Sequence, residues 1–201
     1  MRSIIDTTLL EVINMTWPTL LISVVLIATI RIGYLLKHKD EFVFYKEMLY
    51  LCFMLYILCL FQLVTADDLN ATNGNNFSFF SEILRYEFGG RLFFKNIIGN
   101  IILFMPYGFF ASYYVDIKHP LKAFILITAA SVSIEVTQLA IGRVFDVDDI
   151  LLNVIGGMLG YIVYIILRKI GEKIPFFKKE ICLNILTVLL LIASVVFITW
   201  R

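Results

Sequence analysis

Charge is scarce in this chain. Charged residues make up 16% of its 201 residues, whereas hydrophobic residues make up 60%. This composition excludes a soluble domain of this size and indicates an integral membrane protein. The net charge is only +1, so nothing in the composition points to nucleic acid as a partner.

Cysteine and histidine are also rare, with three and two residues respectively. Cys52, Cys59 and Cys182 lie in or at the edge of apolar runs and lack metal-ligand spacing with His38 and His119. We therefore expect free thiols that pack as small apolar groups, and no disulfide framework.

Long apolar runs are plentiful. Six of them match the ~20 residues that a helix needs to cross a bilayer. The predicted spans are 14–36, 48–65, 96–115, 121–142, 150–167 and 181–199. The sequence thus predicts an all-α, polytopic transmembrane helix bundle of about six spans, forming a single membrane domain over residues 1–201. The first run is too long for a signal peptide and lacks a small-residue cleavage site, so we expect it to be retained.

The placement of lysine and arginine predicts the orientation. Ten of these residues fall in the connections 37–47, 116–122 and 168–180, against six in the termini and the other connections. Because basic residues favour the cytoplasmic side, we predict that both termini, the turn after residue 142 and the long loop 66–95 are extracytoplasmic. Arg31 then lies near the cytoplasmic end of the first span, where we expect its side chain to snorkel.

The loop 66–95 changes character along its length. It begins polar and turn-rich, ADDLNATNGNN, and continues as FSFFSEILRYEFGGRLFF, where aromatic and charged residues mix. The second half predicts an amphipathic segment at the membrane interface, broken by Gly89 and Gly90 before the third span. Asn70 and Asn76 begin glycosylation sequons, which matter only if the source is eukaryotic.

Polar residues recur along one face of the fourth span, at intervals of three and four residues. They are Thr128, Ser131, Glu135, Gln138 and Gly142. A carboxylate at membrane depth costs at least ~2.5 kcal/mol on insertion scales, so such residues usually face a bundle interior and have a function. Glu135 is therefore a candidate site residue.

The third span supplies polar groups from the same side. Lys95 stands at its mouth, and Asn96 and Asn100 are one turn apart. Pro106 removes the amide hydrogen that would bond the carbonyl of Ile102, which predicts a kink and a free acceptor.

The fifth span follows a turn that is rich in charge. Arg143, Asp146, Asp148 and Asp149 precede it, and Asn153 lies about one turn in. A helix cap explains one or two of the aspartates but not three together with an arginine. Gly156 and Gly160 form a G-x-x-x-G pattern that predicts close approach of a neighbouring helix.

Three predicted helices thus direct amides and carboxylates to one outer-leaflet site. Its candidate catalytic residues are Glu135, Asp146 and Asp149, and its candidate ligand-binding residues are Asn96, Asn100, Gln138, Arg143 and Asn153. A buried hydrogen-bond network that only fixes helix packing is the structural alternative. A divalent cation held by Asp146, Asp149 and Asn153 is a further alternative, although no tight D-x-D-x-D-G loop is present.

The same residues resemble the VanZ-like family of small bacterial membrane proteins. Its pattern is N-x-x-x-F-x-P-x-G, then E-x-x-Q, G-R-x-x-D-x-x-D and N-x-x-G. The matching residues are Asn100, Phe104, Pro106, Gly108, Glu135, Gln138, Gly142, Arg143, Asp146, Asp149, Asn153 and Gly156. The resemblance covers about residues 90–165. It implies a bacterial plasma-membrane protein associated with low-level resistance to teicoplanin and related lipoglycopeptides, with no implied cofactor or oligomeric state.

Three functions compete on these residues. The first is a protein that binds or modifies a membrane lipid or a lipid-linked cell-wall precursor at the outer leaflet. The second is an intramembrane enzyme acting on a polyprenyl-phosphate or phospholipid head group, with Glu135 or Asp149 as general acid or base. The third is a small lipid transporter whose path follows the face from Thr128 to Gly142. It ranks last, because no matching charge appears in the inner half.

Overall fold

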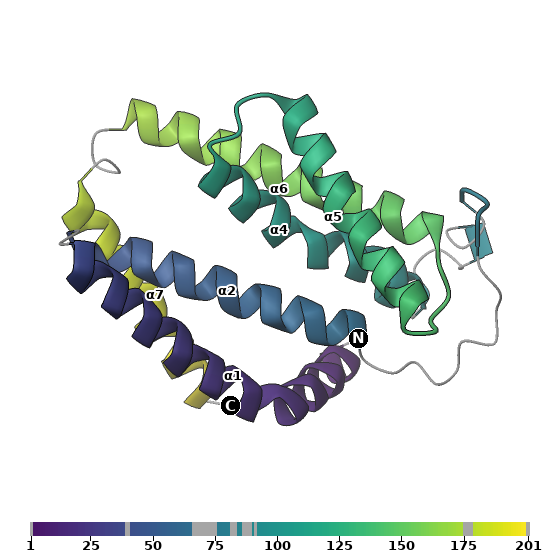
Figure 1. Ribbon diagram of the computed structural model, residues 1–201, viewed down its shortest axis with the longest axis horizontal. Helices are drawn as coiled ribbons and strands as arrows, with labels where there is room; N and C mark the ends of the chain where they lie inside the picture. The colour runs from purple at the N-terminus through teal and green to yellow at the C-terminus, as the bar shows by residue number, and fades with distance from the viewer. Residues whose placement is uncertain are drawn as a thin grey trace. The chain divides into compact units, whose positions relative to one another are not determined.

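The predicted all-α fold is confirmed by the computed structural model, which describes residues 2–38, 41–65, 76–80, 84–85, 90, 92–174 and 179–199 (Figure 1). Its helices are α1 (Arg2–His38), α2 (Phe44–Thr65), the π-helix η1 (Phe93–Ile98), α4 (Gly99–Val115), α5 (Pro120–Ala140), α6 (Val147–Lys173) and α7 (Glu180–Thr199). Five of the described helices, α1, α2, α4 with the end of η1, α5 and α6, are long and apolar enough to cross a membrane, and the chain is a multi-pass membrane protein.

Several helices extend beyond the apolar runs that predicted them. Helix α1 starts at Arg2 instead of residue 14, and α6 continues to Lys173 instead of residue 167. Hydropathy locates the part of a helix that matches lipid, whereas the helix itself ends where its backbone hydrogen bonds end. The π-helical turn η1 before α4 was not predicted.

The described residues form two compact units. One contains Met15–Leu58 and Leu167–Arg201. Within it, Arg31 of α1 forms two hydrogen bonds with the Glu47 carboxylate of α2, at 2.8 and 3.0 Å. Arg31, which we expected to snorkel, thus has an ion-pair partner on the next helix. The Tyr45 amide of α2 donates to the Asn184 side chain of α7 at 2.9 Å, which joins the third helix.

The other unit, Met1–Asn14 and Cys59–Ile166, contains η1, α4, α5 and most of α6 (Figure 1). Its helices touch through glycines of α6. A side-chain carbon at Gly156 or Gly160 would collide with the main chain of α4 at Ile101 or Met105. One at Gly157 would collide with the Ile127 side chain of α5. The close approach that the G-x-x-x-G pattern predicted is confirmed.

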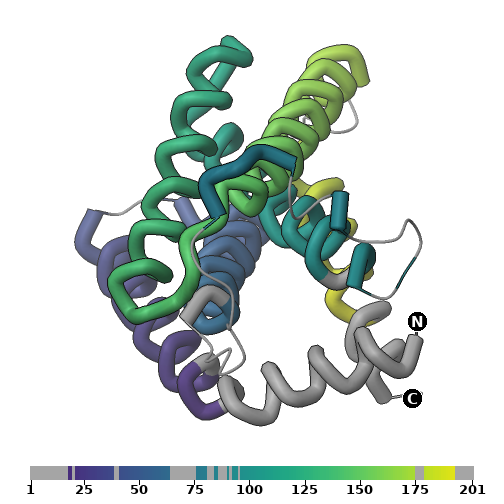
Figure 2. Tube along the Cα trace, turned by 90° about the vertical axis from the view of Figure 1, so that its right-hand side faces the viewer, coloured from purple at the N-terminus to yellow at the C-terminus, as the bar shows by residue number. Residues whose placement is uncertain are grey.

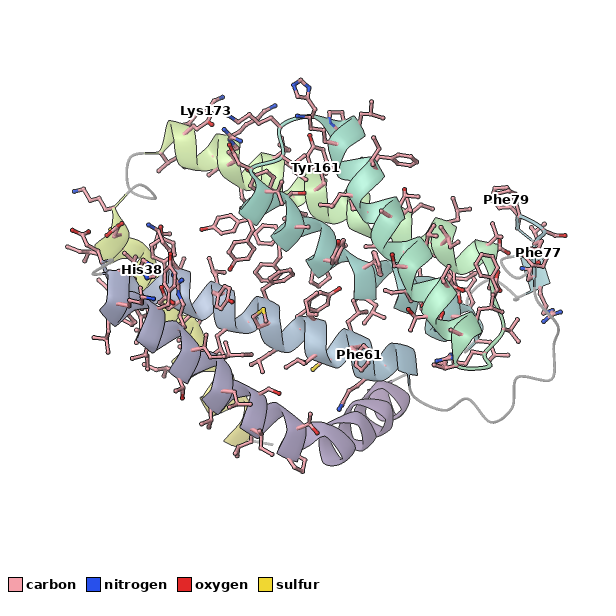
Figure 3. The ribbon with its side chains drawn as sticks, in the orientation of Figure 1. His38, Phe61, Phe77, Phe79, Tyr161 and Lys173 are labelled. Carbon is pink, nitrogen blue, oxygen red and sulfur yellow. The ribbon has the colours of Figure 1, made fainter. Side chains whose placement is uncertain are left out.

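One end of this unit is closed by the loop between α4 and α5. Tyr161 of α6, labelled in Figure 3, donates its hydroxyl to the carbonyl of Lys118 at 3.1 Å. One turn further along α6, the Tyr164 hydroxyl donates to Asp116 at 2.9 Å. These two bonds fix the loop at this end of the unit, and the polar residues predicted to form a site lie at the other end of α6.

Candidate functional site

The opposite end of the unit is where α5 ends and α6 begins, and we call it the polar end. Gly142 follows α5 with φ of +85°, a left-handed conformation that favours glycine. Its amide donates to the carbonyl of Leu139 at 3.1 Å, and the Arg143 amide donates to the carbonyl of Gln138 at 2.9 Å. This pair of bonds is a Schellman motif, which ends the helix and turns the chain toward α6.

The Glu135 carboxylate bridges the two helices. It is 2% exposed, and its Oε2 accepts the main-chain N–H of Asp146 at 3.0 Å. The Arg143 guanidinium attracts this carboxylate, and the Asp146 carboxylate repels it. A carboxylate inside α5 therefore holds the first residue before α6, 11 positions later in the chain.

Asp146 is the capping residue of α6. Its Oδ1 accepts the N–H of Asp148, the second residue of the helix, at 2.8 Å. The same oxygen accepts the Nδ2–H of Asn76 from the long loop at 2.9 Å. Asn76 also pairs with Asp146 in an isolated parallel β-bridge, which confirms that this loop and the turn after α5 lie at the same end of the unit.

Asp148 is completely buried, with 0% of its surface exposed. Its Oδ1 accepts the main-chain N–H of Phe80 at 2.6 Å. Phe80 has φ of +65°, an unusual conformation for an aromatic residue. Asp148 thus binds the long loop through a charge-assisted hydrogen bond. Asp148 is not one of the residues of the VanZ-like pattern.

Asp149 faces a different helix. Its Oδ1 accepts the Nδ2–H of Asn100 of α4 at 2.6 Å. One turn further into α6, the amide of Asn153 donates to the hydroxyl of Ser131 of α5 at 3.1 Å. The three aspartates and Asn153 thereby link α6 to the long loop, to α4 and to α5.

The other predicted site residues lie nearer the surface than Glu135. Gln138 contributes its main-chain carbonyl to the Schellman motif, and Arg143 is partly exposed. Asn96 lies in η1, also partly exposed, and so stands in a π-helical turn instead of the α-helical face that its spacing to Asn100 suggested. π-Helical turns are rare and occur frequently at functional sites.

Segments next to these polar groups in the chain carry large exposed apolar side chains. Phe77, Phe79 and Phe80 of the long loop are 68%, 65% and 52% exposed, and Leu92 and Ile141 are 58% and 50% exposed. Figure 3 shows Phe77 and Phe79 pointing outward beside the start of α6. The predicted interfacial segment is described only in part, since residues 81–83, 86–89 and 91 lie outside the described residues. Its described portion does carry the exposed aromatic side chains that such a segment needs.

The chemical character of the polar end follows from its atoms. Carboxylates on Glu135, Asp146, Asp148 and Asp149 stand with the guanidinium of Arg143, which acts on Glu135. Within the part of the chain that the structure describes, no three acidic, histidine or cysteine side chains are grouped as a metal site would need. The carboxylates can accept hydrogen bonds from hydroxyl and amine groups, while Arg143 can bind an anionic oxygen.

Two residues that bind the aspartates of the polar end, Asn76 and Phe80, were not predicted as site residues. Asn76 was noticed only as part of a sequon, and Phe80 only as part of an aromatic run. Both lie about 70 residues from their aspartate partners, at separations of 70 and 68 positions. The aromatic and charged mixture of the loop indicated an interfacial segment but gave no sign of these partners.

Comparison with known proteins supports the same region. A family model described as VanZ/LLP1 matches residues 47–168, which is more than half of the chain. The match contains every residue described here at the polar end, and it extends toward the N-terminus beyond the region from residue 90 that the motifs indicated. No curated protein and no solved structure matches.

Proposed function

Because the chain belongs to the VanZ/LLP1 family, we propose that its polar end binds or modifies a membrane lipid or a lipid-linked cell-wall precursor and so lowers susceptibility to teicoplanin and related lipoglycopeptides. Family membership supports a membrane protein linked to glycopeptide resistance. Teicoplanin as the affected drug, the outer leaflet and the ligand are parts of our proposal.

One observation carries this proposal. Partly exposed polar groups, including Asn100, Asp149 and Arg143, lie at an end of the unit that is rimmed by exposed Phe77 and Phe79. A lipid-linked ligand has the same division, with a polar head group joined to an apolar tail. The polar groups can bind the head group while the rim contacts the tail, which requires no water-filled path through the bundle.

The test compares isogenic bacterial strains. One lacks the gene, and the others express the wild-type chain, Glu135→Gln or Asp149→Asn at equal membrane abundance. Both substitutions keep an oxygen that can accept the hydrogen bond and remove the charge. We expect both variants to show the teicoplanin susceptibility of the deletion strain.

Glu172→Gln is the matched control, because Glu172 is an exposed carboxylate on α6 outside the polar end. We expect it to behave as wild type. If the deletion strain and the wild type were equally susceptible, the proposed function would be wrong.

A second candidate is an intramembrane enzyme that acts on a polyprenyl-phosphate or phospholipid head group. It is favoured by two carboxylates in different environments, since Glu135 is buried and Asp149 is partly exposed. Such a difference suits a pair in which one group donates a proton and the other accepts one.

This candidate predicts release of inorganic phosphate or a free head group when the purified chain is incubated with a polyprenyl pyrophosphate or a phospholipid. Mass spectrometry would detect either product. Loss of turnover with Asp149→Asn and with a chelator would favour a bound divalent cation, and loss with Asp149→Asn alone would favour acid–base chemistry.

A further inference from the structure

Residues 76–80 of the long loop, which we call the strap, lie beside the start of α6 (Figure 2), and hydrogen bonds hold both ends of the strap there. At one end the main-chain N–H of Asn76 donates to the carbonyl of Phe145 at 2.8 Å, and the main-chain N–H of Val147 donates to the main-chain carbonyl of Asn76 at 3.2 Å. At the other end the Phe80 amide donates to Asp148 at 2.6 Å. Between them, the Phe77 ring stacks on Phe145 with 5.6 Å between ring centroids.

The Asn76 side chain uses both of its polar atoms. Its Nδ2 donates to the Asp146 carboxylate at 2.9 Å, and its Oδ1 accepts the Ser78 amide at 3.0 Å. A carboxylate at this position could accept the second bond but could not donate the first while ionised. The position therefore requires a side chain that donates on one side and accepts on the other.

The contact reaches Glu135 through a single residue. The Asp146 carboxylate accepts a hydrogen bond from the side-chain amide of Asn76. The main-chain N–H of Asp146 donates to the Glu135 carboxylate at 3.0 Å. Its carboxylate also caps α6 through the Asp148 amide. Displacement of Asp146 would therefore alter the helix cap and the Glu135 bond together.

We propose that Asn76 is a positioning residue of the polar end, which orients the Asp146 carboxylate and, through the Asp146 main chain, the Glu135 carboxylate. The role rests on the proposed function, because it assigns Asn76 to the site that binds the lipid or lipid-linked ligand. Asn76 acts through Asp146, so its effect depends on which atom it presents to that carboxylate.

The substitution Asn76→Asp tests this role with almost no change in shape. It keeps the acceptor for Ser78 and replaces the donor to Asp146 by an oxygen of like charge, which repels it. We expect loss of teicoplanin resistance to the level of the deletion strain. We also expect faster hydrogen exchange in peptides covering residues 144–150 of the purified chain, because the amides of Asp146 and Val147 lose their protection.

Two further variants separate positioning from general damage. Ser78→Asp adds the same charge at an exposed position in the strap, and we expect wild-type resistance and exchange. The double variant Asn76→Asp with Asp146→Asn removes the contact between like charges. Because Asn76 and the Asp148 amide both bond to Oδ1 of Asp146, the new amide at position 146 can keep only one of these two bonds. We therefore expect it to recover part of the protection of residues 144–150 that Asn76→Asp loses.

The outcomes distinguish this inference from the proposed function. Equal susceptibility of wild type and deletion strain would overturn the proposed function, and the exchange experiment would still judge the link from Asn76 to Asp146. Unchanged exchange in Asn76→Asp, or no recovery in the double variant, would overturn the inference. Full resistance in Asn76→Asp, in a background where the wild type confers resistance, would also overturn it.

Discussion

Asn100 and Asp149 lie 49 positions apart in the chain and are joined by a hydrogen bond of 2.6 Å between α4 and α6. The donor is an amide and the acceptor a carboxylate, so the bond is charge-assisted. It fixes one turn of α4 against the first turns of α6 at the polar end.

Replacement of these two residues should have unequal effects. Asn100→Ala removes the donor from a partly buried carboxylate, which we expect to lower the free energy of unfolding by about 1–3 kcal/mol. Asp149→Asn keeps an acceptor oxygen and should cost less. Thermal unfolding of the two single variants and the double variant in one detergent measures both effects and their coupling. Equal losses for the two single variants would contradict the asymmetry.

The contact between α4 and α6 predicts a strong dependence on glycine. Gly156→Ala would drive a methyl group into the main chain at Ile101, which cannot yield as a flexible side chain can. Overpacking of this kind costs about 1–3 kcal/mol. We expect a lower unfolding temperature and reduced membrane abundance for this variant.

Gly171 on the same helix supplies the matched control. A side-chain carbon there has no neighbour within 4 Å. Gly171→Ala should therefore raise stability by about 0.4–1 kcal/mol, because alanine restricts the unfolded chain without a clash. A similar loss in both variants would show that helix contact is not the cause.

The ion pair between Arg31 and Glu47 predicts that removing one of the two side chains lowers the free energy of unfolding more than removing both. The Glu47 side chain is 10% exposed and the Arg31 side chain 37% exposed. Arg31→Ala leaves a nearly buried carboxylate without its cation, which we expect to lower the free energy of unfolding by about 1–3 kcal/mol. The double variant Arg31→Ala with Glu47→Ala should be less damaged than the single one.

Unfolding of the single and double variants in the same detergent measures this difference. Arg168→Ala is the control, since its pair with Glu172 is exposed at the glutamate and links positions i and i+4. We expect it to change stability by only about 0.3–0.5 kcal/mol. A double variant that is worse than Arg31→Ala would show that the two side chains do not act as a pair.

Thr128 offers a test of the transport hypothesis. Its Oγ1 is buried and, among the described residues, has no hydrogen-bond partner. If this part of α5 is dry, Thr128→Val removes an unsatisfied hydroxyl at almost constant shape, and stability should stay the same or rise by about 1 kcal/mol. Unfolding measurements should be paired with an assay of labelled-lipid translocation in proteoliposomes. Destabilisation together with lost translocation would favour a wet path along this face.

The helices and the membrane class could be predicted because they depend on long-range averages of the sequence. Apolar runs reveal spans, whereas the sidedness expected from basic residues stays a prediction. Glycines spaced by four predicted the close contact of α6. The start of α1 and the end of α6 were missed, because helical hydrogen bonding continues beyond the apolar region at Arg2 and at Lys173.

Pairing between distant residues was the part that could not be predicted. Glu135 and Asp149 stood out because charge is rare in an apolar helix. Their partners, the Asp146 amide and Asn100, belong to other elements, and one sequence gives no register between them. Asn76 was harder still, because a polar residue in a polar loop attracts no notice. The prediction thus located the acidic residues and left the bonds among them to the structure.

The glycine contacts of α6 have a mechanical consequence. At Gly108, Gly156 and Gly160 the main chains of α4 and α6 touch without intervening side chains. Rotation of side chains cannot separate two main chains that touch directly, so α4 and α6 should move together as one rigid pair. Helix α5 instead contacts Gly157 through the Ile127 side chain, which can rotate. A movement that opens the bundle should therefore displace α5 more easily than it separates α4 from α6.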